Sequence, residues 1–542
     1  MVCKRYRVQK GWLHLPIGRD ARRYYVKVEV GGRQIAELYL GLAPLNPDFY
    51  CAMELRAFVG QTVCLTAEEG APEGILDGWI DGDDIRPGHS LYPDLYRERL
   101  RPVYHFSSRR GWLNDPNGLV FDGEYHHLYY QHNPYGITHG GVNIHWGHAV
   151  STDGVCWEEK PDAIWPESRD RHIASGSAIV DRAGTAGYGK GAIIAAYTAL
   201  GSKDLRTDPP GIYPSGGQCL MYSTDGGMRF QPFSYNPLIA CTEGLPWRDP
   251  RILEVPGEGF YIAVYETNER GNCVSFYRSD DLHRWTFVSA TDDLYECPDL
   301  FALTPENDGE KRWVLYGADG MYRVGDFREG RFRQIGERRP LDYGSSAYAG
   351  QTWTGREDAD GRMHISWVRD ERLSWDDVNS YPNMPFSQCM SLPCLLTLTK
   401  TDAGYRLRRN PIPALQRLRK SGGRRAEARG QKRFEWTPTE ASETLLDVQA
   451  RQTMRLEFGS VFIEYDPCTR RIRFSSGKEE VLPNAPSLSI RAFVDRTSVE
   501  FFIGGEISAT FGMETAGKKC SLSSQQGMDA IVEAYDLSPI HP

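Results

Sequence analysis

Three carboxylic acids in this chain each stand next to or near a proline, in segments that suit catalysis or ligand binding. Asp115 lies in residues 111–119, GWLNDPNGL; Asp249 lies in residues 248–250, RDP; and Glu296 lies in residues 295–299, YECPD. Asn, Asp, Pro and Gly at the density found around Asp115 indicate a turn, so this acid is predicted where a strand gives way to a turn. The flanking amides favour an ionised carboxylate held in one orientation. This is the environment of a nucleophile or a ligand-binding acid, and a solvated acid in an ordinary loop is the alternative.

With their flanking segments, the three acids resemble the signature of glycoside hydrolase family 32, which contains invertases, inulinases, levanases and other β-fructosidases. The resemblance runs from about residue 100 to the C-terminus and includes YYQHNP at 129–134, WGHA at 146–149, SGSA at 175–178, YAGQTW at 348–353 and FVDRTSVE at 493–500. Several motifs in the same order along the chain indicate a family more specifically than any single motif does. The resemblance implies a five-bladed β-propeller catalytic domain followed by a β-sandwich. It also implies a retaining hydrolase that cleaves β-fructofuranosidic linkages and releases fructose.

The resemblance also implies a role for each acid. Cleavage of a ketoside needs one carboxylate for the anomeric carbon and one acid for the leaving oxygen. By resemblance, Asp115 is the nucleophile and Glu296 the general acid/base, while Asp249 stabilises the transition state and, with Arg248, binds fructose hydroxyls. The less polar neighbours of Glu296 are expected to favour its protonated form. Retention of configuration predicts that the Asp115 and Glu296 carboxyls lie roughly 5–5.5 Å apart.

Four further positions match residues of the family's sugar site. Asn114 and Gln131 are expected to hydrogen-bond the fructosyl unit, Ser175 comes from the Ser-Gly-Ser motif, and Trp367 matches a tryptophan that lines the site.

The sequence departs from the family pattern at two positions that normally form an apolar wall around the bound fructose. Ala174 stands where an aromatic residue usually precedes Ser-Gly-Ser, and residues 139–142, HGGV, occupy a stretch that usually holds a tryptophan. Loss of the wall opens the pocket or admits another side chain, and His139 is the candidate. We therefore expect specificity to shift from plain sucrose towards an unusual fructoside or a bulkier linkage.

The acids must be positioned by a β-structure that converges, and residues 99–400 contain a repeat that fits one. A Ser-x-Asp turn followed by an aromatic residue recurs at 151–157, 223–230 and 279–285. Repeats of a strand-turn-strand unit at intervals of roughly 55–75 residues are typical of propeller blades. Blades converge on an axis, where acids distant in sequence can meet. Similar hairpins in another all-β fold are the alternative.

The all-β chain is predicted to have two further domains. Residues 1–98 form a small N-terminal β-domain, because residues 24–30 alternate apolar and polar, a Gly-Gly turn follows, and residues 35–40 return as a strand. Nothing in this domain indicates chemistry. The arginine-rich residues 401–425 are predicted to be a solvated linker. Alternating residues from 488 to 511 then predict a C-terminal β-sandwich over 426–542.

Bulk properties exclude several classes of partner. The 542 residues suggest two or three domains, and the net charge of −9 argues against nucleic acid. No run approaches the ~18 apolar residues of a membrane helix. The 12 cysteines show neither a Cys-x-x-Cys pair nor a disulfide framework.

With no secretory signal visible at the N-terminus, the expected location is the cytoplasm, and a processed secreted form is the alternative.

No metal or cofactor is predicted, and the expected partner is a small-molecule or oligosaccharide fructoside. Histidines 126, 127, 132, 139, 145 and 148 cluster in the sequence, but strand residues three apart face opposite sides, and the resemblance implies a family that needs no metal. Two other functions stay open. One is a fructosyltransferase, including an enzyme that forms or cleaves difructose anhydrides. The other is a catalytically inactive fructan-binding protein, against which the three acids argue. Linkage preference, exo or endo action and oligomeric state are open.

Overall fold

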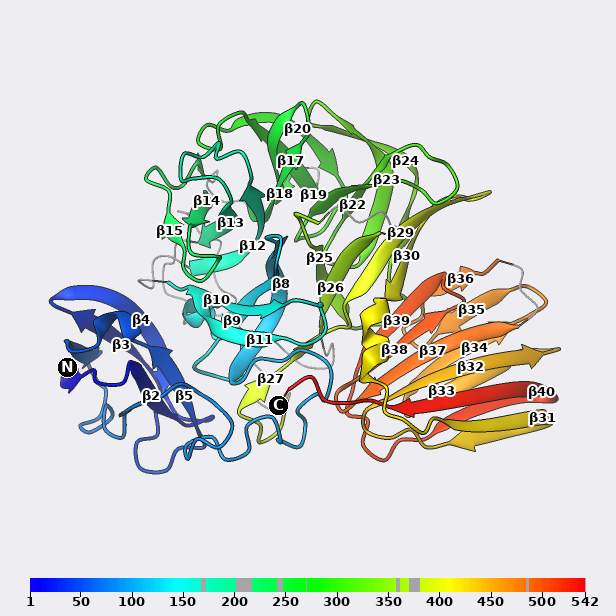
Figure 1. Cartoon of the computed structure of the whole chain (residues 1–542), viewed down its shortest axis with the longest axis horizontal. Helices are drawn as coiled ribbons and strands as arrows, with labels where there is room; N and C mark the ends of the chain where they lie inside the picture. The colour runs from blue at the N-terminus through cyan, green and yellow to red at the C-terminus, as the bar shows by residue number, and fades with distance from the viewer. Residues whose placement is uncertain are drawn as a thin grey trace.

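The computed structural model of this chain describes residues 1–541 except 167–171, 201–216, 241–246, 270, 357–360, 370–380 and 484–486. The regular secondary structure of the described residues is β-strand, apart from three short 3-10 helices. Figure 1 shows three regions in chain order: a small N-terminal β-domain, a broad ring of sheets and a C-terminal stack of long strands. Within the described residues, no helix has the length and apolarity needed to span a bilayer.

The N-terminal domain consists of two small sheets. The first has the order β1 (Val2–Arg7), β6 (Thr62–Ala67), β3 (Arg23–Val30) and β4 (Arg33–Gly41); the second has the order β5 (Phe49–Glu54), β2 (Trp12–Ile17) and β7 (Ile80–Gly82). The predicted hairpin is confirmed: Gly31 and Gly32 join β3 to β4 at φ values of +57° and +79°, which glycine adopts without a steric penalty.

Five antiparallel sheets, here called sheets I to V, follow one another along the described part of the chain. Sheet I contains β8 (Gly111–Phe121), β9 (His126–Asn133), β10 (His145–Ser151) and β11 (Glu158–Ile164), with the short β27 (Phe386–Ser387) beside β8. Sheet II contains β12 (His172–Asp181), β13 (Ala192–Leu200), β14 (Gly217–Ser223) and β15 (Gln231–Pro232), with β16 (Ile239–Ala240) beside β14. Sheet III contains β17 (Trp247–Val255), β18 (Gly259–Asn268), β19 (Gly271–Ser279) and β20 (Thr286–Asp292). Sheet IV contains β21 (Asp299–Leu303), β22 (Arg312–Tyr316), β23 (Met321–Arg328) and β24 (Arg331–Pro340). Sheet V contains β25 (Ala347–Thr352), β26 (Arg362–Val368), β29 (Cys394–Thr401) and β30 (Gly404–Pro411), with β28 (Cys389–Met390) beside β26.

Buried apolar clusters close these sheets into a ring. Each cluster spans two neighbouring sheets, as shown by the members Tyr129 and Ile193 (I and II), Ile194 and Ile252 (II and III), Phe276 and Leu315 (III and IV), Val314 and Leu398 (IV and V), and Ile365 and Leu119 (V and I). The first strands contact one another as well, since β12 touches β8 and β17, β17 touches β21, and β25 touches β8. The first strands therefore meet near the middle of the ring (Figure 1).

The Ser-x-Asp repeat marks equivalent positions in three successive sheets. Ser151, Ser223 and Ser279 are the last residues of the third strands β10, β14 and β19. Each hydroxyl donates to the aspartate two residues later, with O–O distances of 2.9, 2.7 and 3.1 Å. The repeat therefore corresponds to a structural unit, the turn between the third and fourth strands of sheets I to III.

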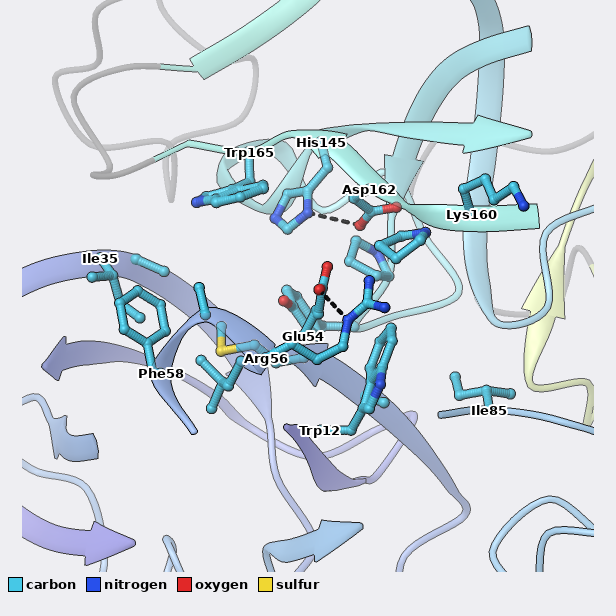
Figure 2. A pocket seen from close by; sticks show the side chains of 18 of the residues that line it. Trp12, Ile35, Glu54, Arg56, Phe58, Ile85, His145, Lys160, Asp162 and Trp165 are labelled. Atoms are coloured by element: carbon cyan, nitrogen blue, oxygen red, sulfur yellow. Dashed lines mark hydrogen bonds and ion pairs between the residues drawn. The ribbon is translucent and has the colours of Figure 1, made fainter. Parts of the chain in front are cut away.

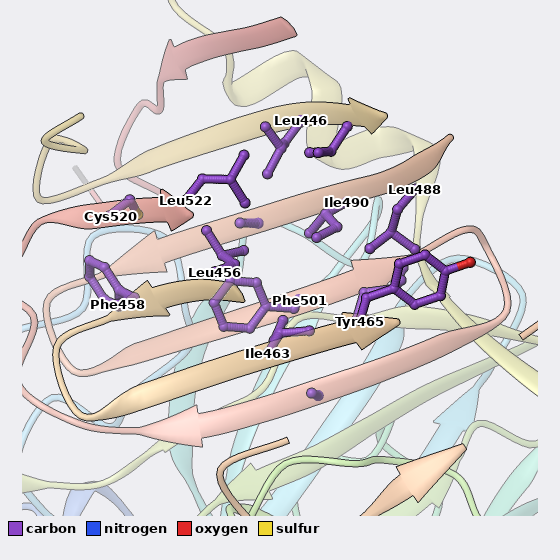
Figure 3. Packing of buried hydrophobic residues seen from close by; sticks show 14 of the residues in the cluster. Leu446, Leu456, Phe458, Ile463, Tyr465, Leu488, Ile490, Phe501, Cys520 and Leu522 are labelled. Carbon is purple, nitrogen blue, oxygen red and sulfur yellow. The ribbon is translucent and has the colours of Figure 1, made fainter. Parts of the chain in front are cut away.

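The C-terminal region is built around one very long strand, β40 (Cys520–Asp536). Its first part pairs with β33 (Met454–Phe458) and its second part with β32 (Ser442–Ala450), while β31 (Arg424–Trp436) pairs along both parts. The remaining strands are β34 (Val461–Asp466), β35 (Arg471–Phe474), β36 (Glu479–Val481), β37 (Leu488–Asp495), β38 (Ser498–Ile503) and β39 (Ile507–Gly512). Figure 3 shows Leu456 and Ile463 packed against Ile490 and Phe501 within one apolar core. This is the sandwich that the alternating residues predict.

The predicted linker at 401–425 is wrong at its start. β30 pairs with β29 along its whole length, so sheet V continues to Pro411, and the 3-10 helix η3 (Pro413–Leu418) follows. The arginines of β30 are buried or partly buried and have acidic partners. Arg408 Nη1 lies 2.9 Å from Glu306 Oε2, and Arg409 Nη2 lies 3.0 Å from Glu500 Oε2. Their acidic partners are distant in sequence, which is why the arginine run reads as a linker.

Candidate active site

One polar residue from each of the five sheets enters a single connected group near the middle of the ring. Asp115 lies on β8, Ser175 on β12, Asp249 on β17 and Tyr348 on β25, while Glu296 lies three residues before β21. Convergence of the first strands therefore brings together the three acids that the sequence singles out.

Backbone irregularities aim these side chains. Pairing shifts in register at Leu113/Pro116 in β8, at Ile173/Gly176 in β12, at Arg248/Arg251 in β17 and at Tyr348/Gln351 in β25. A β-bulge of this kind bends its strand and redirects a side chain. The predicted turn at Asp115 is therefore wrong, because the strand runs on through Pro116 and absorbs it at the bulge.

Strained backbone accompanies the bulges. Asp249, Glu296, Cys297 and Ala349 have φ values of +64°, +47°, +40° and +50°. Non-glycine residues in this region cost about 1–3 kcal/mol each, and such residues gather at functional sites. The surrounding ring must supply the packing that holds them.

Asp115 is 8% exposed and accepts hydrogen bonds from Ser175, Asn114 and the Cys297 thiol. Ser175 Oγ donates to its Oδ2 at 2.7 Å, and Asn114 Nδ2 lies 3.1 Å from its Oδ1. Trp112 Nε1 donates to Asn114 Oδ1 at 2.8 Å, which fixes the orientation of that amide. Burial raises the pKa of Asp115, although the bonds from Ser175 and Asn114 act in the opposite direction. The predicted donors are present, but desolvation outweighs them.

Asp249 is the most strongly perturbed of the three acids. Its backbone N–H donates to Thr198 Oγ1 at 3.0 Å, and its carboxylate Oδ2 accepts from the Cys297 backbone N–H at 3.2 Å. Burial raises the pKa of Asp249 to about 7, against the lowering effect of Arg248, and the charges of Glu296 and Asp115 raise it further. Near neutral pH this carboxyl therefore holds a proton for part of the time.

Glu296 lies between two polar side chains. Arg248 Nη2 donates to its Oε1, and the Tyr348 hydroxyl donates to its Oε2. The Arg248 guanidinium also lies over the Tyr265 ring, 5.0 Å from its centroid. The less polar setting predicted for Glu296 is therefore wrong, because residues from sheets III and V surround it with donors that its sequence neighbours do not reveal.

The Cys297 thiol links two of the acids. Its Sγ lies 3.5 Å from both Asp115 Oδ2 and Asp249 Oδ2. Burial raises the pKa of this thiol well above its usual value, so it stays neutral and can donate. Neither Cys297 nor Tyr348 is among the predicted site residues. Both lie inside segments that carry the family resemblance, 295–299 and 348–353, and this position in the sequence could have pointed to them.

The other predicted sugar-site residues are distributed around this group. Trp367 is buried and lies edge-on to Trp112 and Tyr348, with ring centroids 5.9 and 6.0 Å away. Gln131 is buried on β9, and its Nε2 has no hydrogen-bond partner among the described residues. That amide is thus available to a ligand. Ala174 lies directly beside Ser175 and is not fully buried.

The loop that lacks the family's tryptophan is held by the N-terminal domain. The Asn143 side chain bonds both backbone groups of Tyr39, at 2.8 and 2.7 Å, and Arg23 Nη2 donates to Thr138 Oγ1 at 2.9 Å. Tyr135 and Ile137 of the same loop belong to the buried core of the N-terminal domain. His139 lies between these anchors and is partly exposed; its entry into the sugar pocket stays a prediction.

Four of the six clustered histidines form two separate pairs. His127 Nδ1 lies 3.0 Å from His148 Nε2, whereas His132 and His145 both bond Asp162, at 2.8 and 2.9 Å. In the described part of the chain, no group of three or more His, Cys, Asp or Glu residues is arranged to hold a metal ion.

Comparison with known proteins gives a consistent result. The model of the glycosyl hydrolases family 32 N-terminal domain matches residues 105–411, which is sheets I to V. A levanase of Bacillus subtilis (strain 168) is 30% identical over 461 residues, which cover 75% of this chain and 65% of that protein. The chain thus spans slightly less than two thirds of this relative, and the match to the levanbiose-producing levanase of the same organism covers 62% of that protein.

Solved structures share the fold. Exo-inulinase from Aspergillus awamori superposes with a TM-score of 0.70 at 23% identity, covering 82% of this chain and 99% of that chain. A Bombyx mori GH32 beta-fructofuranosidase mutant in complex with sucrose superposes with a TM-score of 0.65 at 26% identity, covering 82% of this chain and 95% of that chain.

Proposed function

Because this chain belongs to glycoside hydrolase family 32, we propose that it is a retaining hydrolase that cleaves β-fructofuranosidic linkages and releases fructose. The relatives named levanase, and the beta-fructofuranosidase structure that holds sucrose, support a fructoside as the substrate. In this proposal sheets I to V are the blades of a five-bladed β-propeller, and the three acids lie at its axis.

One observation carries the proposal: the three acids form a connected network that orients each of them differently. Ser175 and Asn114 donate to Asp115, the Cys297 backbone N–H donates to Asp249, and Arg248 and Tyr348 donate to Glu296. A glycosidase needs carboxyl groups in distinct roles, which distinct surroundings provide.

The role of each acid is assigned by its match to the family's motifs. Asp115 is the nucleophile: it attacks the anomeric carbon while Glu296 gives a proton to the leaving oxygen, so that a fructosyl–enzyme ester and a free alcohol form. In the second step Glu296 takes a proton from water, the hydroxide attacks the same carbon, and Asp115 is released as a carboxylate. Asp249 and Arg248 bind the fructose hydroxyls and stabilise the transition state.

Around the reacting groups, Asn114, Gln131 and Ser175 hydrogen-bond the fructosyl unit, and Trp367 supplies an apolar floor. The buried Gln131 Nε2 without a partner among the described residues supports this assignment, since a buried amide donor is costly unless a ligand satisfies it.

We further propose that specificity has shifted from sucrose towards a bulkier or unusual fructoside. Ala174 precedes Ser175, whose hydroxyl donates a hydrogen bond to Asp115. The loop that contains His139 is held against the N-terminal domain by the hydrogen bond between Asn143 and Tyr39. Both features leave the usual apolar wall of the fructose pocket incomplete. The small side chain of Ala174 and the position of this loop against the N-terminal domain together make room for a larger leaving group.

Product analysis tests the activity. Wild type and Asp115→Asn are incubated with sucrose, 1-kestose, inulin, levan and difructose anhydrides, and the products are separated by chromatography. Asp115→Asn should release fructose at least about 10³-fold more slowly than wild type, since loss of the nucleophile removes the covalent route. Asp308→Asn is the matched control, because Asp308 lies outside the acid network, near Tyr405 and Lys400, and its replacement should leave the rate unchanged.

The same assay separates the two alternatives. New oligosaccharides or anhydrides from wild type would show that a sugar hydroxyl replaces water, which is fructosyl transfer. Saccharide binding without any product from wild type would contradict the proposal and favour a fructan-binding protein.

The specificity proposal has its own variant. Ala174→Phe restores the aromatic wall and should raise kcat/KM for sucrose by several-fold, with a lower KM, because the apolar contact with the bound fructose returns. Steady-state kinetics on sucrose and 1-kestose measure the effect, and a loss of sucrose turnover in a folded variant would count against the open-wall explanation.

A further inference from the structure

A cavity of about 360 Å³ lies between the N-terminal domain and the outer strand of sheet I, away from the acid network. Its lower wall comes from β2, β5 and η1 (Arg56–Phe58), and its upper wall from β10, β11 and the residues that follow β11. The volume lies within the range of about 300–1,000 Å³ that is usual for small-molecule sites. The cavity exists only because two domains meet, a common origin of binding sites.

Aromatic side chains stand on both walls. Figure 2 shows Trp12 and Phe58 on the N-terminal wall and Trp165 opposite them, next to His145. Trp165 is 40% exposed although it is large and apolar, whereas Trp12 is 6% exposed and lies under the Arg56 guanidinium at 5.7 Å. An amphipathic aromatic face offers contact to the C–H surface of a sugar ring, while polar groups around it reach the hydroxyls.

The acidic residues on the walls already have partners. Glu54 Oε1 accepts from Arg56 Nε at 2.5 Å and from Arg229 Nη2 at 3.1 Å. Asp162 is bonded by His132 and His145 at 2.8 and 2.9 Å. Glu159 is paired as well, with Arg109 Nε 3.5 Å from its Oε1. Each acid of the lining therefore has a basic or imidazole partner, and the walls present no unpaired negative charge to a ligand.

Hydrogen-bonding capacity remains for a ligand. The second ring nitrogen of His145, Nε2, is buried and has no partner among the described residues. Both donors to Glu54 bind the same oxygen, so Oε2 keeps its lone pairs for a hydroxyl group. A buried imidazole nitrogen and a carboxylate oxygen on opposite walls can each satisfy a hydroxyl of one ligand.

We propose that this cavity is a second, non-catalytic saccharide-binding site, which takes a short neutral fructo-oligosaccharide between Trp12 and Trp165. The identity of the sugar rests on the proposed function; the site itself rests on the aromatic walls, the paired charges and the unsatisfied His145 nitrogen. A second site on the same chain holds a fructan segment near the catalytic ring and raises its effective concentration there.

Calorimetric titration of the full-length Asp115→Asn protein with 1-kestose tests the proposal, because the inactive background leaves the sugar intact. We expect two binding events. Trp165→Ala, introduced into that background, should weaken one of them at least about tenfold and leave the other in place, and Glu54→Gln should weaken the same event. Phe287→Ala is the matched control, since Phe287 is an exposed aromatic residue of β20 outside the cavity, and it should change neither event.

Two results would overturn the inference: a single binding event that Trp165→Ala does not change, or a cavity that takes inorganic phosphate in preference to 1-kestose. Fructose release by the wild type is measured separately. Fructose release without the second event would sink only this inference, and a second event without fructose release would sink only the proposed activity.

Discussion

At the residue scale, the proposed chemistry depends on the three acids having different surroundings within one small volume. Cys297 stands between Asp115 and Asp249, with its thiol 3.5 Å from both carboxylates. Among the described residues, Arg248 is the cation that contacts Asp249 and Glu296 together. These two carboxyls and the nearby Asp115 cannot all ionise at low cost, and the pKa of Asp249 is the one raised to about 7.

The raised pKa of Asp249, about 7, predicts a specific pH dependence of stability. Its folded pKa lies above its unfolded value, so its contribution to stability is present below about pH 4 and is lost as the pH rises through about 7. Asp249→Asn cannot ionise. At pH 8 it should therefore increase the free energy of unfolding by about 1–4 kcal/mol, and the gain should vanish towards pH 4.

Thermal or denaturant unfolding of wild type and Asp249→Asn across this pH range measures that difference. The variant should at the same time lose about 10²-fold or more in kcat/KM. This is expected of a residue that lowers the stability of the fold but stabilises the transition state. A stability gain of equal size at pH 4 and pH 8 would show that ionisation of Asp249 is not its cause.

At the scale of elements, bulges and domain contacts set the shape of the site. Four of the five first strands shift register at a site residue, which points side chains inward that a regular strand would place elsewhere. The N-terminal domain, to which the sequence analysis assigns no chemistry, holds the loop 134–144 of sheet I.

This loop anchor leads to a prediction with an internal control. Asn143→Ala removes two hydrogen bonds to Tyr39 and should release the loop, changing KM for 1-kestose at least about threefold and lowering stability by about 1–3 kcal/mol. Asn307 makes the same pair of bonds, at 2.8 Å each, to the backbone of Lys400 between sheets IV and V. Asn307→Ala should cost similar stability but leave KM unchanged.

Steady-state kinetics and unfolding curves of both variants show whether KM depends on the position of the loop or on stability alone. Equal shifts in KM for the two would mean that stability alone, and not the position of the loop, affects the site.

At the scale of the whole molecule, a buried charge cluster joins the ring of sheets to the sandwich. His105 Nδ1 lies 2.8 Å from Asp495 and its Nε2 lies 3.0 Å from Glu500, while Arg409 Nη2 lies 3.0 Å from Glu500. Buried charges of this kind are tolerated only when each is paired and hydrogen-bonded. The relative position of the two regions therefore depends on a few charged groups as well as on apolar contact.

Glu500→Gln removes the carboxylate that Arg409 and His105 share and leaves them only Asp342, at 3.5 Å from Arg409, and Asp495, at 2.8 Å from His105. The substitution should lower the free energy of unfolding by about 3 kcal/mol. The bonds from Arg409 and His105 hold the pKa of Glu500 at about 2 despite its burial, so its contribution is present above its unfolded pKa and is lost as the pH falls through about 2. Bonds to Asp495 and Glu500 raise the pKa of His105 to about 9, so that contribution is complete below its unfolded pKa and fades as the pH rises through about 9.

Denaturant unfolding from about pH 1.5 to about pH 10 covers the fall through the low pKa of Glu500 and the rise through the high pKa of His105, in wild type and Glu500→Gln. Glu464→Gln is the surface control, because the pair between Glu464 and Arg455 is partly exposed and its loss should cost less than about 1 kcal/mol. A Glu500→Gln effect as small as that of the control would contradict a structural role for the cluster.

The sequence alone determined what depends on local patterns. The Gly-Gly hairpin, the Ser-x-Asp turns and the alternating strands of the sandwich are short-range features, because a turn or a two-residue period is set by neighbours along the chain. The motifs also single out Asp115, Asp249 and Glu296 before any contact is known. Only the tertiary structure decided their surroundings: the donors that reach Glu296, the thiol between two acids, the loop held by Asn143 and the acids that pair with Arg409. Burial and charge act through space, between residues far apart in sequence, so the chain itself does not show which groups will share an environment.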